Sequence, residues 1–333
     1  MKRRTALASL LGTLAAPALA QPVKIKIVVF NSISDGALFV ALEKSWFRAE
    51  GLEVEIAQLD TGAAIHAALA SEAVDAAGDS PAVALYNAAR QRIGFKVVAD
   101  KGSTPPGHGY QAIMVRSDLA ESVKTAADLR GKRFGLTGWM NGVANEAMMN
   151  KLLTANGIAE REINFVNLSY PDVLAGLGTK AIDAGILIEP LAARAEELGT
   201  AKIWKRADEV YANQQYGVLV YGPGLLKRGA APDAFMRAYL KGARFYNDAL
   251  DGKSPRAGLV EILTKYTAVK NPAAYDRMRF PGIDPNGGIN VAGLAQDMAY
   301  YVASGRQRQA IDMSLIIDQG YAQRAVGQLG RYG

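Results

Sequence analysis

The residues best suited to chemistry in this 333-residue sequence are hydroxyls and glycines that follow predicted strands. Ser32 and Ser34 come after the first such strand, Thr61 and Gly62 after the second, and Ser80 after the third. Each of them alone is also an ordinary helix cap. In an open α/β sheet, however, ligands bind beyond the carboxyl ends of the strands, where free N–H groups of the following helices point. Together these residues predict a pocket that holds a small anion with neutral donors.

A second set of residues is predicted to face the first across a cleft. The loop 138–142 offers glycines and an asparagine, and its Trp139 and Met140, with Tyr110 and Tyr216, would form an apolar wall for a cargo with a hydrophobic part. The alternative is that Trp139 and Met140 simply pack between two lobes. The complete predicted site is Ser32, Ser34, Asp35, Thr61, Gly62, Asp79, Ser80, Tyr110, Gly138, Trp139, Met140, Asn141, Gly142, Glu189 and Tyr216.

Three carboxylates in this set, Asp35, Asp79 and Glu189, oppose a simple anion. They would repel it unless they bind an ammonium group, a hydroxyl or a neighbouring cation. Asp79 also suits the start of a helix. Glu189 ends an apolar strand at the edge where ligands bind, so it could bond either to the cargo or to a loop from the other side. The carboxylates could therefore serve the ligand or bridge the cleft.

The sequence lacks the patterns of an enzyme or of a metal site. It has no cysteine, which excludes disulfides, thiolate metal ligands and a thiol nucleophile. His66 and His108 are the only histidines; they show no metal-ligand spacing, and His66 lies in an apolar helical stretch. Neither G-x-S-x-G nor G-x-x-x-x-G-K-[ST] occurs, and no G-x-G-x-x-G follows a strand. We therefore expect no catalytic residue, no metal and no cofactor.

The elements that must position these residues alternate along the chain. Strands are predicted at 24–30, 52–59, 74–77 and 95–99, with helices at 37–50, 62–72 and 80–92. The same rhythm returns with strands at 111–116, 132–136, 163–168 and 181–188 and helices at 125–129, 143–155 and 171–177. Such alternation is typical of parallel βαβ units covered by helices, so two α/β lobes are expected. Beyond about residue 223 the periodicity is mainly helical, at 234–248, 257–266, 291–304 and 314–326.

The N-terminus has the pattern of a secretory signal peptide. Lys2, Arg3 and Arg4 precede an apolar run over 6–16, and an A-x-A site ends at Ala20. We therefore expect residues 1–20 to be removed. With no cysteine to carry a lipid and no later apolar run of membrane-spanning length, the mature protein is predicted to be soluble and, in a cell with two membranes, periplasmic.

The charge of the chain gives no sign of a nucleic-acid partner. The net charge of +6 includes the three basic residues of the predicted signal peptide, and the remaining basic residues are scattered rather than clustered. We therefore expect no nucleic-acid binding. We also expect the protein to be a monomer.

The order and spacing of several phrases resemble the substrate-binding proteins of ABC importers in the nitrate, sulfonate and taurine (NMT1/THI5-like) group. The phrases are LFVALEKSWF at 38–47 with GLEV at 51–54, AALASEAVD at 67–75, ADLRGKRFG at 127–135 and DAGILIEP at 183–190. The resemblance implies a two-lobed periplasmic binding protein of type II, each lobe a mixed, mostly parallel sheet flanked by helices, with C-terminal helices. It places lobe 1 at 21–108 plus 216–333 and lobe 2 at 109–215. It also implies hinge closure over a ligand, and delivery to a membrane permease driven by an ATPase.

The resemblance leaves the cargo open. An alkanesulfonate, taurine, an aromatic carboxylate or a thiamine-precursor pyrimidine each fits some of the loops, and nitrate fits least well. An exported sensor subunit is the alternative from another class. Enzymes of thiamine and menaquinone synthesis share the fold, but the thiamine enzyme needs a cysteine-rich motif that this chain lacks.

Overall fold

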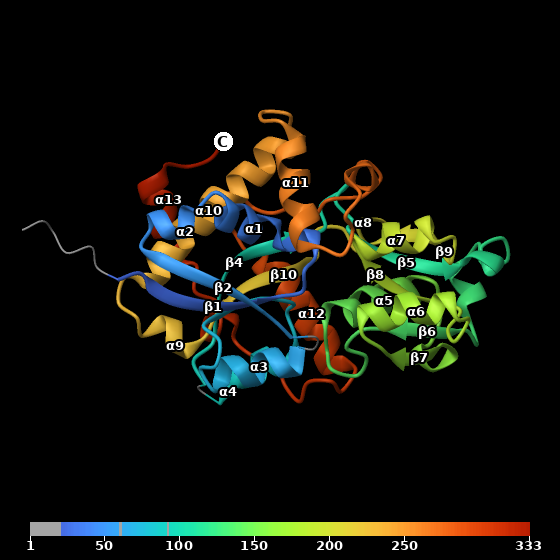
Figure 1. Cartoon of the computed structure of the whole chain (residues 1–333). Helices are drawn as coiled ribbons and strands as arrows, with labels where there is room; N and C mark the ends of the chain where they lie inside the picture. The colour runs from blue at the N-terminus through green and yellow to red at the C-terminus, as the bar shows by residue number, and fades with distance from the viewer. Residues whose placement is uncertain (1–20, 60–61, 92) are drawn as a thin grey trace, which may run out of the picture.

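The computed structural model describes residues 21–59, 62–91 and 93–333. The predicted signal peptide and Thr61 lie outside the described residues. The described chain forms two lobes, each built on a five-stranded mixed sheet (Figure 1). This confirms the predicted fold class.

The first sheet has the strand order β2-β1-β3-β10-β4. β1 is parallel to β2 and β3, whereas β10 is antiparallel to β3 and β4. The alternation of residue types in β1 determines which of its faces is buried: Ile25 and Ile27 are each only 1% exposed, whereas Lys24 and Lys26 face the solvent. The strands are β1 (Val23–Val29), β2 (Leu52–Gln58), β3 (Ala76–Asp79), β4 (Lys96–Ser103) and β10 (Gln215–Tyr221).

The second sheet repeats this arrangement with the order β7-β6-β8-β5-β9. β6 is parallel to β7 and β8, and β5 is antiparallel to β8 and β9. In both sheets the antiparallel strand in fourth position is the first strand after the chain crosses from the other lobe. The strands are β5 (Gln111–Arg116), β6 (Arg133–Leu136), β7 (Asn164–Asn167), β8 (Ala184–Ile188) and β9 (Ala201–Arg206). β9 and β10 were not among the predicted strands.

Helices cover both sheets. In the N-terminal part they are α1 (Gly36–Glu43), α2 (Trp46–Ala49), α3 (Gly62–Ala70) and α4 (Val83–Arg90), and around the second sheet α5 (Ala144–Ala155), α6 (Tyr170–Gly178), α7 (Leu191–Glu197) and α8 (Ala207–Val210). Short 3₁₀ helices lie at Ile33–Asp35, Ser117–Leu119, Ala126–Leu129, Glu160–Glu162, Pro272–Asp276 and Met313–Leu315. The single helix predicted over 37–50 is wrong, because Ser45 adopts a left-handed conformation (φ 57°) that separates α1 from α2.

The C-terminal helices pack back onto the lobes. They are α9 (Pro223–Leu226), α10 (Ala231–Leu250), α11 (Arg256–Tyr266), α12 (Val291–Ala303) and α13 (Gly320–Leu329). α10 and α13 lie against the first lobe, and α12 contacts both β10 and α5. α13 begins six residues later than the predicted start at 314. α10 lies against α1 so closely that a Cβ at Gly242 would overlap the carbonyl oxygen of Ala37. None of the described helices is long and apolar enough to span a membrane.

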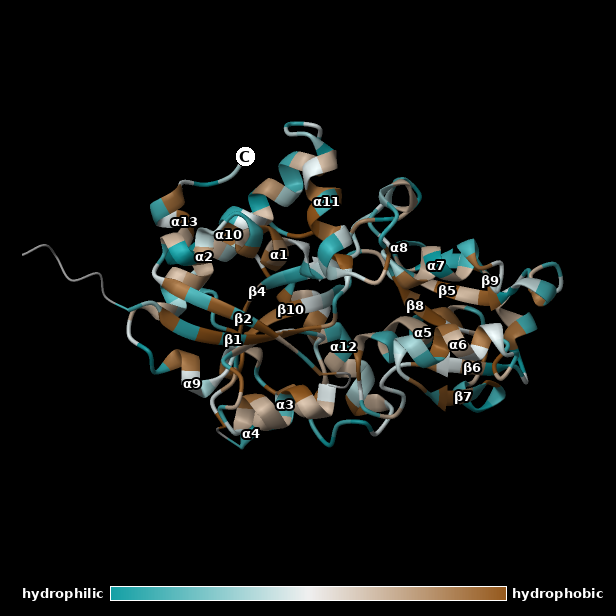
Figure 2. Ribbon diagram, in the orientation of Figure 1, coloured by the Kyte–Doolittle hydropathy of each residue, from teal (hydrophilic) through white to brown (hydrophobic). Residues whose placement is uncertain are grey.

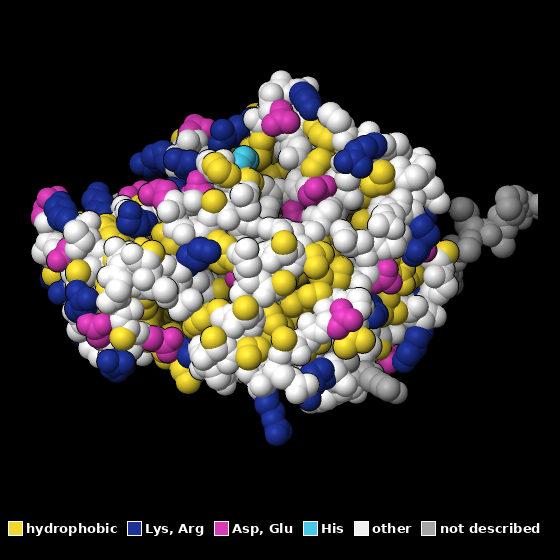
Figure 3. Space-filling view, turned by 180° about the vertical axis from the view of Figure 1, so that it is seen from behind, with side chains coloured by type: hydrophobic (Ala, Val, Ile, Leu, Met, Phe, Trp, Pro, Cys, Tyr) yellow, Lys and Arg dark blue, Asp and Glu magenta, His cyan; other side chains and the backbone are white. Residues whose placement is uncertain are grey.

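Apolar side chains connect the interiors of the two lobes. One core cluster contains Val28 and Ala77 of the first sheet, Ile113 and Phe134 of the second, and Leu294 of α12. Figure 2 shows apolar residues along the strands in the middle of both lobes and polar residues on the outer sides of the helices. On the face seen in Figure 3, acidic and basic side chains are interspersed around the margin. α12 therefore helps to join the lobes.

The chain crosses between the sheets along two neighbouring segments. β4 leads into β5 and β9 leads into β10. The backbone N–H of Asn213 donates to the carbonyl oxygen of Thr104 (2.7 Å), and the N–H of Gln214 donates to the Thr104 hydroxyl (3.0 Å). These bonds hold the two crossing segments side by side.

Asp183 forms ion pairs with Arg116 and Arg133 in the second lobe. It therefore makes a pH-dependent contribution to the free energy of unfolding. The neighbouring Arg133, aided by Arg116, lowers the pKa of Asp183 from 3.8 to about 2. Because the pKa is lower in the folded state, the ionised carboxylate stabilises the fold at pH values above the unfolded-state pKa. This stabilisation is lost as the pH falls toward the folded-state pKa. We expect Asp183→Asn to lower the free energy of unfolding by about 1–2 kcal/mol at pH 7, and by progressively less below pH 4.

Urea unfolding at pH 7, 5 and 3.5 measures this effect. Asp118→Asn is the matched control, because Asp118 pairs with the same Arg116 but is 46% exposed, and it should change stability less than Asp183→Asn at pH 7. A loss for Asp183→Asn that stays constant down to pH 3.5 would contradict the assignment.

Candidate functional site

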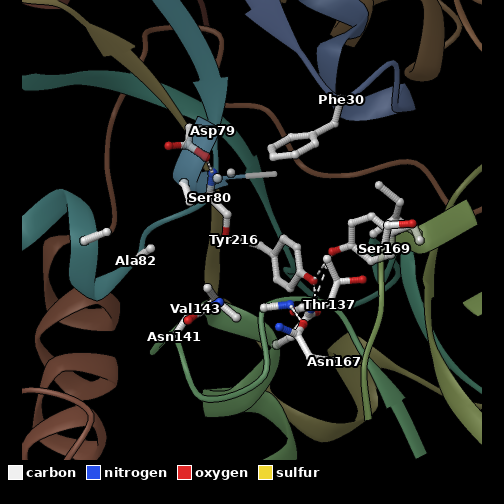
Figure 4. Close-up of a pocket in the computed structure, with 18 of the residues that line it drawn as sticks. Phe30, Asp79, Ser80, Ala82, Thr137, Asn141, Val143, Asn167, Ser169 and Tyr216 are labelled. Atoms are coloured by element: carbon white, nitrogen blue, oxygen red, sulfur yellow. Dashed lines mark hydrogen bonds between the residues drawn. The ribbon is translucent and has the colours of Figure 1, made fainter. Parts of the chain in front are cut away.

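A pocket of about 640 Å³ lies between the two sheets. Residues of both lobes line it, from the ends of β1 and β3, from α3, from the loop before α5 and from the start of α6. Figure 4 shows Asp79 and Ser80 on one side of the pocket, Asn141, Asn167 and Ser169 on the other side, and Tyr216 between them. Most of the surface that lines it is apolar, although about half of the lining residues carry polar or charged side chains.

A buried ion pair forms part of the pocket floor. Lys101, on β4, is 2% exposed, and its Nζ donates to Asp35 Oδ1 (2.7 Å) and to Ser34 Oγ (3.0 Å). The other carboxylate oxygen of Asp35 accepts from the backbone N–H of Ser32 (2.9 Å). These bonds occupy two of the three donors of the ammonium group. Lys101 lines the pocket, so its third donor can serve a ligand.

Three tyrosines build an aromatic wall. The rings of Tyr110 and Tyr216 meet edge to face with centroids 5.7 Å apart. The Tyr216 hydroxyl bonds to Asn145 of α5 and lies 3.0 Å from the hydroxyl of Tyr170. Burial raises the pKa of Tyr216 well above its usual value, so its hydroxyl stays protonated. Tyr216 belongs to β10 and the other two hydrogen-bonding residues to lobe 2, so this network joins the lobes.

Two further contacts connect the lobes beside the pocket. Ala82 and Val143 form an isolated antiparallel bridge, in which the N–H of Val83 donates to the Gly142 carbonyl oxygen (2.9 Å). The Ser32 hydroxyl donates to the Glu189 carbonyl oxygen (3.2 Å). The lobes therefore contact each other around the pocket in this conformation.

A histidine–carboxylate pair lies on the wall formed by α3. His66 Nε2 is 2.6 Å from Asp79 Oδ2, and the other oxygen of Asp79 accepts from the N–H of Ser80 (2.8 Å). Burial alone would lower the pKa of His66, but the charge and hydrogen bond of Asp79 raise it above 6.5 on balance. Among the described residues, no group of three His, Cys, Asp or Glu side chains could hold a metal ion.

The structure brings ten of the fifteen predicted residues to the pocket lining. They are Ser32, Ser34, Gly62, Asp79, Ser80, Tyr110, Gly138, Met140, Asn141 and Tyr216. Thr61 lies outside the described residues. That these residues bind a ligand remains a prediction.

Four predicted residues lie behind the lining. Asp35 is fully buried against Lys101. Trp139 stacks on Phe165 of the same lobe, with ring centroids 4.1 Å apart. The Gly142 N–H donates to Glu146, and no Gly142 atom lines the pocket. The Glu189 side chain turns away, where it accepts from Arg206 (3.0 Å) and from the N–H of Ala193 (2.9 Å). The Glu189 carbonyl oxygen accepts from the Ser32 hydroxyl and from the Ile33 N–H of the other lobe.

Several lining residues were not predicted. Lys101 was missed because the predicted strand ended at 99, whereas β4 continues to Ser103. A charged residue inside a buried strand can be recognised only when its ion-pair partner is known. His66 was assigned to the helix alone. Asn145 and Tyr170 lie in the first turns of α5 and α6, outside the predicted set. The other unpredicted polar side chains on the lining are Asn87, Thr137, Asn167, Ser169, Asp172 and Arg306.

Residues 34–249 match the family described as NMT1/THI5 like. The chain belongs to this family. No curated protein sequence matches the chain. The resemblance seen in the sequence is thereby confirmed, and the matched segment of this NMT1/THI5-like protein contains almost all of the pocket lining.

Solved structures share the fold of this NMT1/THI5-like protein. The periplasmic nitrate-binding protein NrtA from Synechocystis PCC 6803 superposes with a TM-score of 0.77 at 11% identity, covering 93% of this chain and 90% of that chain. The alkanesulfonate-binding protein SsuA from Xanthomonas axonopodis pv. citri, bound to MOPS, gives 0.67 at 19% identity, over 90% and 99%. A mutant of DszB in complex with biphenyl-2-sulfinic acid gives 0.64 at 14% identity, over 92% and 99%. At these identities the likeness establishes the type II periplasmic binding protein fold.

Proposed function

We propose that this NMT1/THI5-like protein is the solute-binding subunit of an ABC importer and captures a small organic anion between its lobes. The observation that carries the proposal is the pocket itself, whose walls come from both lobes and whose floor holds a buried ammonium. Only contacts that exist in the closed form shift an equilibrium toward closure. A cargo that touches Lys101 on one lobe and Asn141 on the other would supply such contacts.

The size and lining of the pocket favour an organic anion over nitrate. A volume of about 640 Å³ far exceeds a four-atom ion, and Phe30, Tyr110 and Met140 offer apolar contacts to a carbon skeleton. The alkanesulfonate-binding and biphenyl-2-sulfinic acid structures of the same fold support sulfur oxyanions with such skeletons. We propose an alkanesulfonate, taurine or an aromatic carboxylate as cargo.

The lobes would open along the two crossing segments. We propose 21–108 plus 216–333 as lobe 1 and 109–215 as lobe 2, with the bonds between Thr104 and residues 213–214 as the fixed point of the hinge. The loaded protein would deliver cargo to a membrane permease driven by an ATPase. This role places the protein in the periplasm, where residues 1–20 would export it.

One alternative cargo is favoured by a specific observation. Asp79 and Asp172 both line the pocket and carry carboxylates that suit the amino group of a thiamine-precursor pyrimidine. A sensor subunit would bind the same ligands, and a permease and an ATPase encoded beside this chain would favour the importer. An enzyme would convert the bound compound, whereas a binding protein releases it unchanged.

Calorimetric titration with benzenesulfonate, taurine, benzoate, nitrate and an aminopyrimidine tests the proposal. We expect an organic anion to bind, and Ser80→Ala and Asn141→Ala each to weaken it by about 1–2 kcal/mol, because each removes one neutral donor. Ser71→Ala, an exposed hydroxyl away from the pocket, is the control and should leave binding unchanged. Unchanged affinity in both pocket variants would refute the site, and preferential binding of the pyrimidine would select the alternative cargo.

A further inference from the structure

We infer that His66 couples capture of an anion to uptake of a proton, and so sets how strongly the pocket prefers an anion to a neutral ligand of the same shape. The inference rests on the proposed function, because it concerns the cargo of the same pocket. It assigns a specificity-determining role to a residue that sequence patterns placed only in a helix.

The position of His66 is fixed by its surroundings. Its side chain is 11% exposed, lines the pocket and holds Asp79, itself 2% exposed, at 2.6 Å. Phe95 packs nearby, with ring centroids 6.4 Å apart. Ser80 N–H fixes the other oxygen of Asp79. Protonation of the imidazole therefore changes the electrostatic potential at a defined place on the pocket wall.

The other charged side chains beside the pocket already have ion-pair or hydrogen-bond partners. Lys101 is paired with Asp35, and Arg306 is paired with Glu146 (2.7 Å) and Glu160 (2.6 Å). At the far wall, Asp172 accepts from the Ser169 hydroxyl.

Asp79 differs from Asp35, Glu146 and Glu160, because a cation stands beside it only when His66 is protonated. The α3 wall thus carries one net negative charge at high pH and none at low pH. An anion is repelled in the first state and accepted in the second.

Among the titratable groups on the elements packed against α3, the His66–Asp79 pair sets the charge of the pocket wall. β3 presents Asp79 to the imidazole. α4 carries Tyr86, which is fully buried, and Arg90, which is exposed. α9 carries no titratable side chain. Burial opposes protonation of His66, but the carboxylate of Asp79 raises the pKa of His66 above its ordinary value, so the imidazole takes up a proton more readily than a free one.

The coupling between proton uptake at His66 and anion binding in the pocket is reciprocal. A bound anion stabilises the imidazolium, and by linkage the imidazolium stabilises the bound anion by the same free energy. His66 Nδ1 is buried and has no hydrogen-bond partner among the described residues, so an added proton there has no protein acceptor. Negative charge on a cargo would offset that cost, which strengthens the coupling.

Binding measurements at several pH values test the inference. The probes are benzenesulfonate and its neutral counterpart benzenesulfonamide, titrated from pH 6 to pH 8.5. We expect the affinity for benzenesulfonate to fall by up to about 10-fold over this range, which corresponds to a pKa shift of one unit on binding. The affinity for benzenesulfonamide should stay constant. In His66→Gln the pH dependence for benzenesulfonate should disappear.

Proton NMR reports the protonation of His66 directly. The chain has two histidines, and His108 bonds to the Phe280 carbonyl oxygen away from the pocket, so His108→Gln leaves one imidazole signal. We expect its pKa to rise when benzenesulfonate binds, and to fall in Asp79→Asn. Binding of benzenesulfonate with no change in the His66 pKa and no pH dependence would overturn this inference alone. Failure of every anion to bind at any pH would overturn the proposed function, and this inference with it.

Discussion

Lys101→Met should lower the free energy of unfolding by about 3–5 kcal/mol, because it leaves the Asp35 carboxylate buried without its partner. Asp35 is 0% exposed, so water cannot replace the lost ammonium. Urea unfolding at pH 7 measures the loss. Lys124→Met is the matched control, because its ion pair with Glu121 is exposed, and it should change the free energy of unfolding far less.

The same substitution should also weaken anion binding by roughly 10- to 100-fold, the effect of losing one charged hydrogen bond. The double variant Lys101→Met with Asp35→Asn separates the two effects. It removes both charges, and its amide oxygen can still accept from the Ser32 N–H, so most of the stability should return. Anion binding should remain weak. If the double variant bound benzenesulfonate as tightly as the unmodified protein, Lys101 would have no role in binding the anion.

A disulfide between positions 82 and 143 should stop cargo exchange. Ala82 and Val143 face each other in an isolated antiparallel bridge that joins the lobes. The hydrogen bond from Val83 to Gly142 makes them a non-hydrogen-bonded pair, whose close Cα spacing suits a disulfide. The chain has no other cysteine, so Ala82→Cys with Val143→Cys gives a single possible crosslink within the molecule. We expect release of a preloaded probe to slow by on the order of 100-fold or more in the oxidised protein.

Stopped-flow displacement of a bound probe measures this release. Addition of reductant should restore the original rate, and each single cysteine variant should behave as the unmodified protein. Oxidised protein that still exchanges cargo at the original rate would show that the lobes need not separate.

The strands that the sequence predicts well are those with an unbroken local pattern. β1 alternates buried isoleucines with exposed lysines, and its isoleucines lie opposite Val54 and Ile56 of β2. β10 is buried along its whole length, so its apolar run has no period of two, and its partners β3 and β4 lie more than 100 residues earlier. Such a strand is fixed by tertiary pairing, which local sequence does not contain.

The candidate site shows the same division. Ser32, Gly62 and Ser80 were predicted because each follows a strand, and the carboxyl ends of neighbouring parallel strands meet at one edge. Lys101 could not be predicted, because its burial depends on Asp35, 66 residues away. Glu189 was placed at the cleft edge, but its charge is held by Arg206 from the next strand. Buried charges follow their partners rather than their own sequence context.

The shared strand order of the two sheets suits the proposed closure of the lobes as units. Each sheet receives its fourth strand directly after a crossing, so the two crossings end inside the sheets and lie side by side. A rotation about them moves each sheet without unpairing its strands. This arrangement links the fold to the proposed closure over cargo.

Native mass spectrometry of the protein purified from its host tests whether it captures an organic anion. We expect a small organic anion bound one to one, released unchanged on denaturation and absent from the Lys101→Met, Asp35→Asn variant. Recovery of a converted compound would contradict this expectation in favour of an enzyme. So would protein that carries no small molecule and gains no thermal stability from any of the proposed anions.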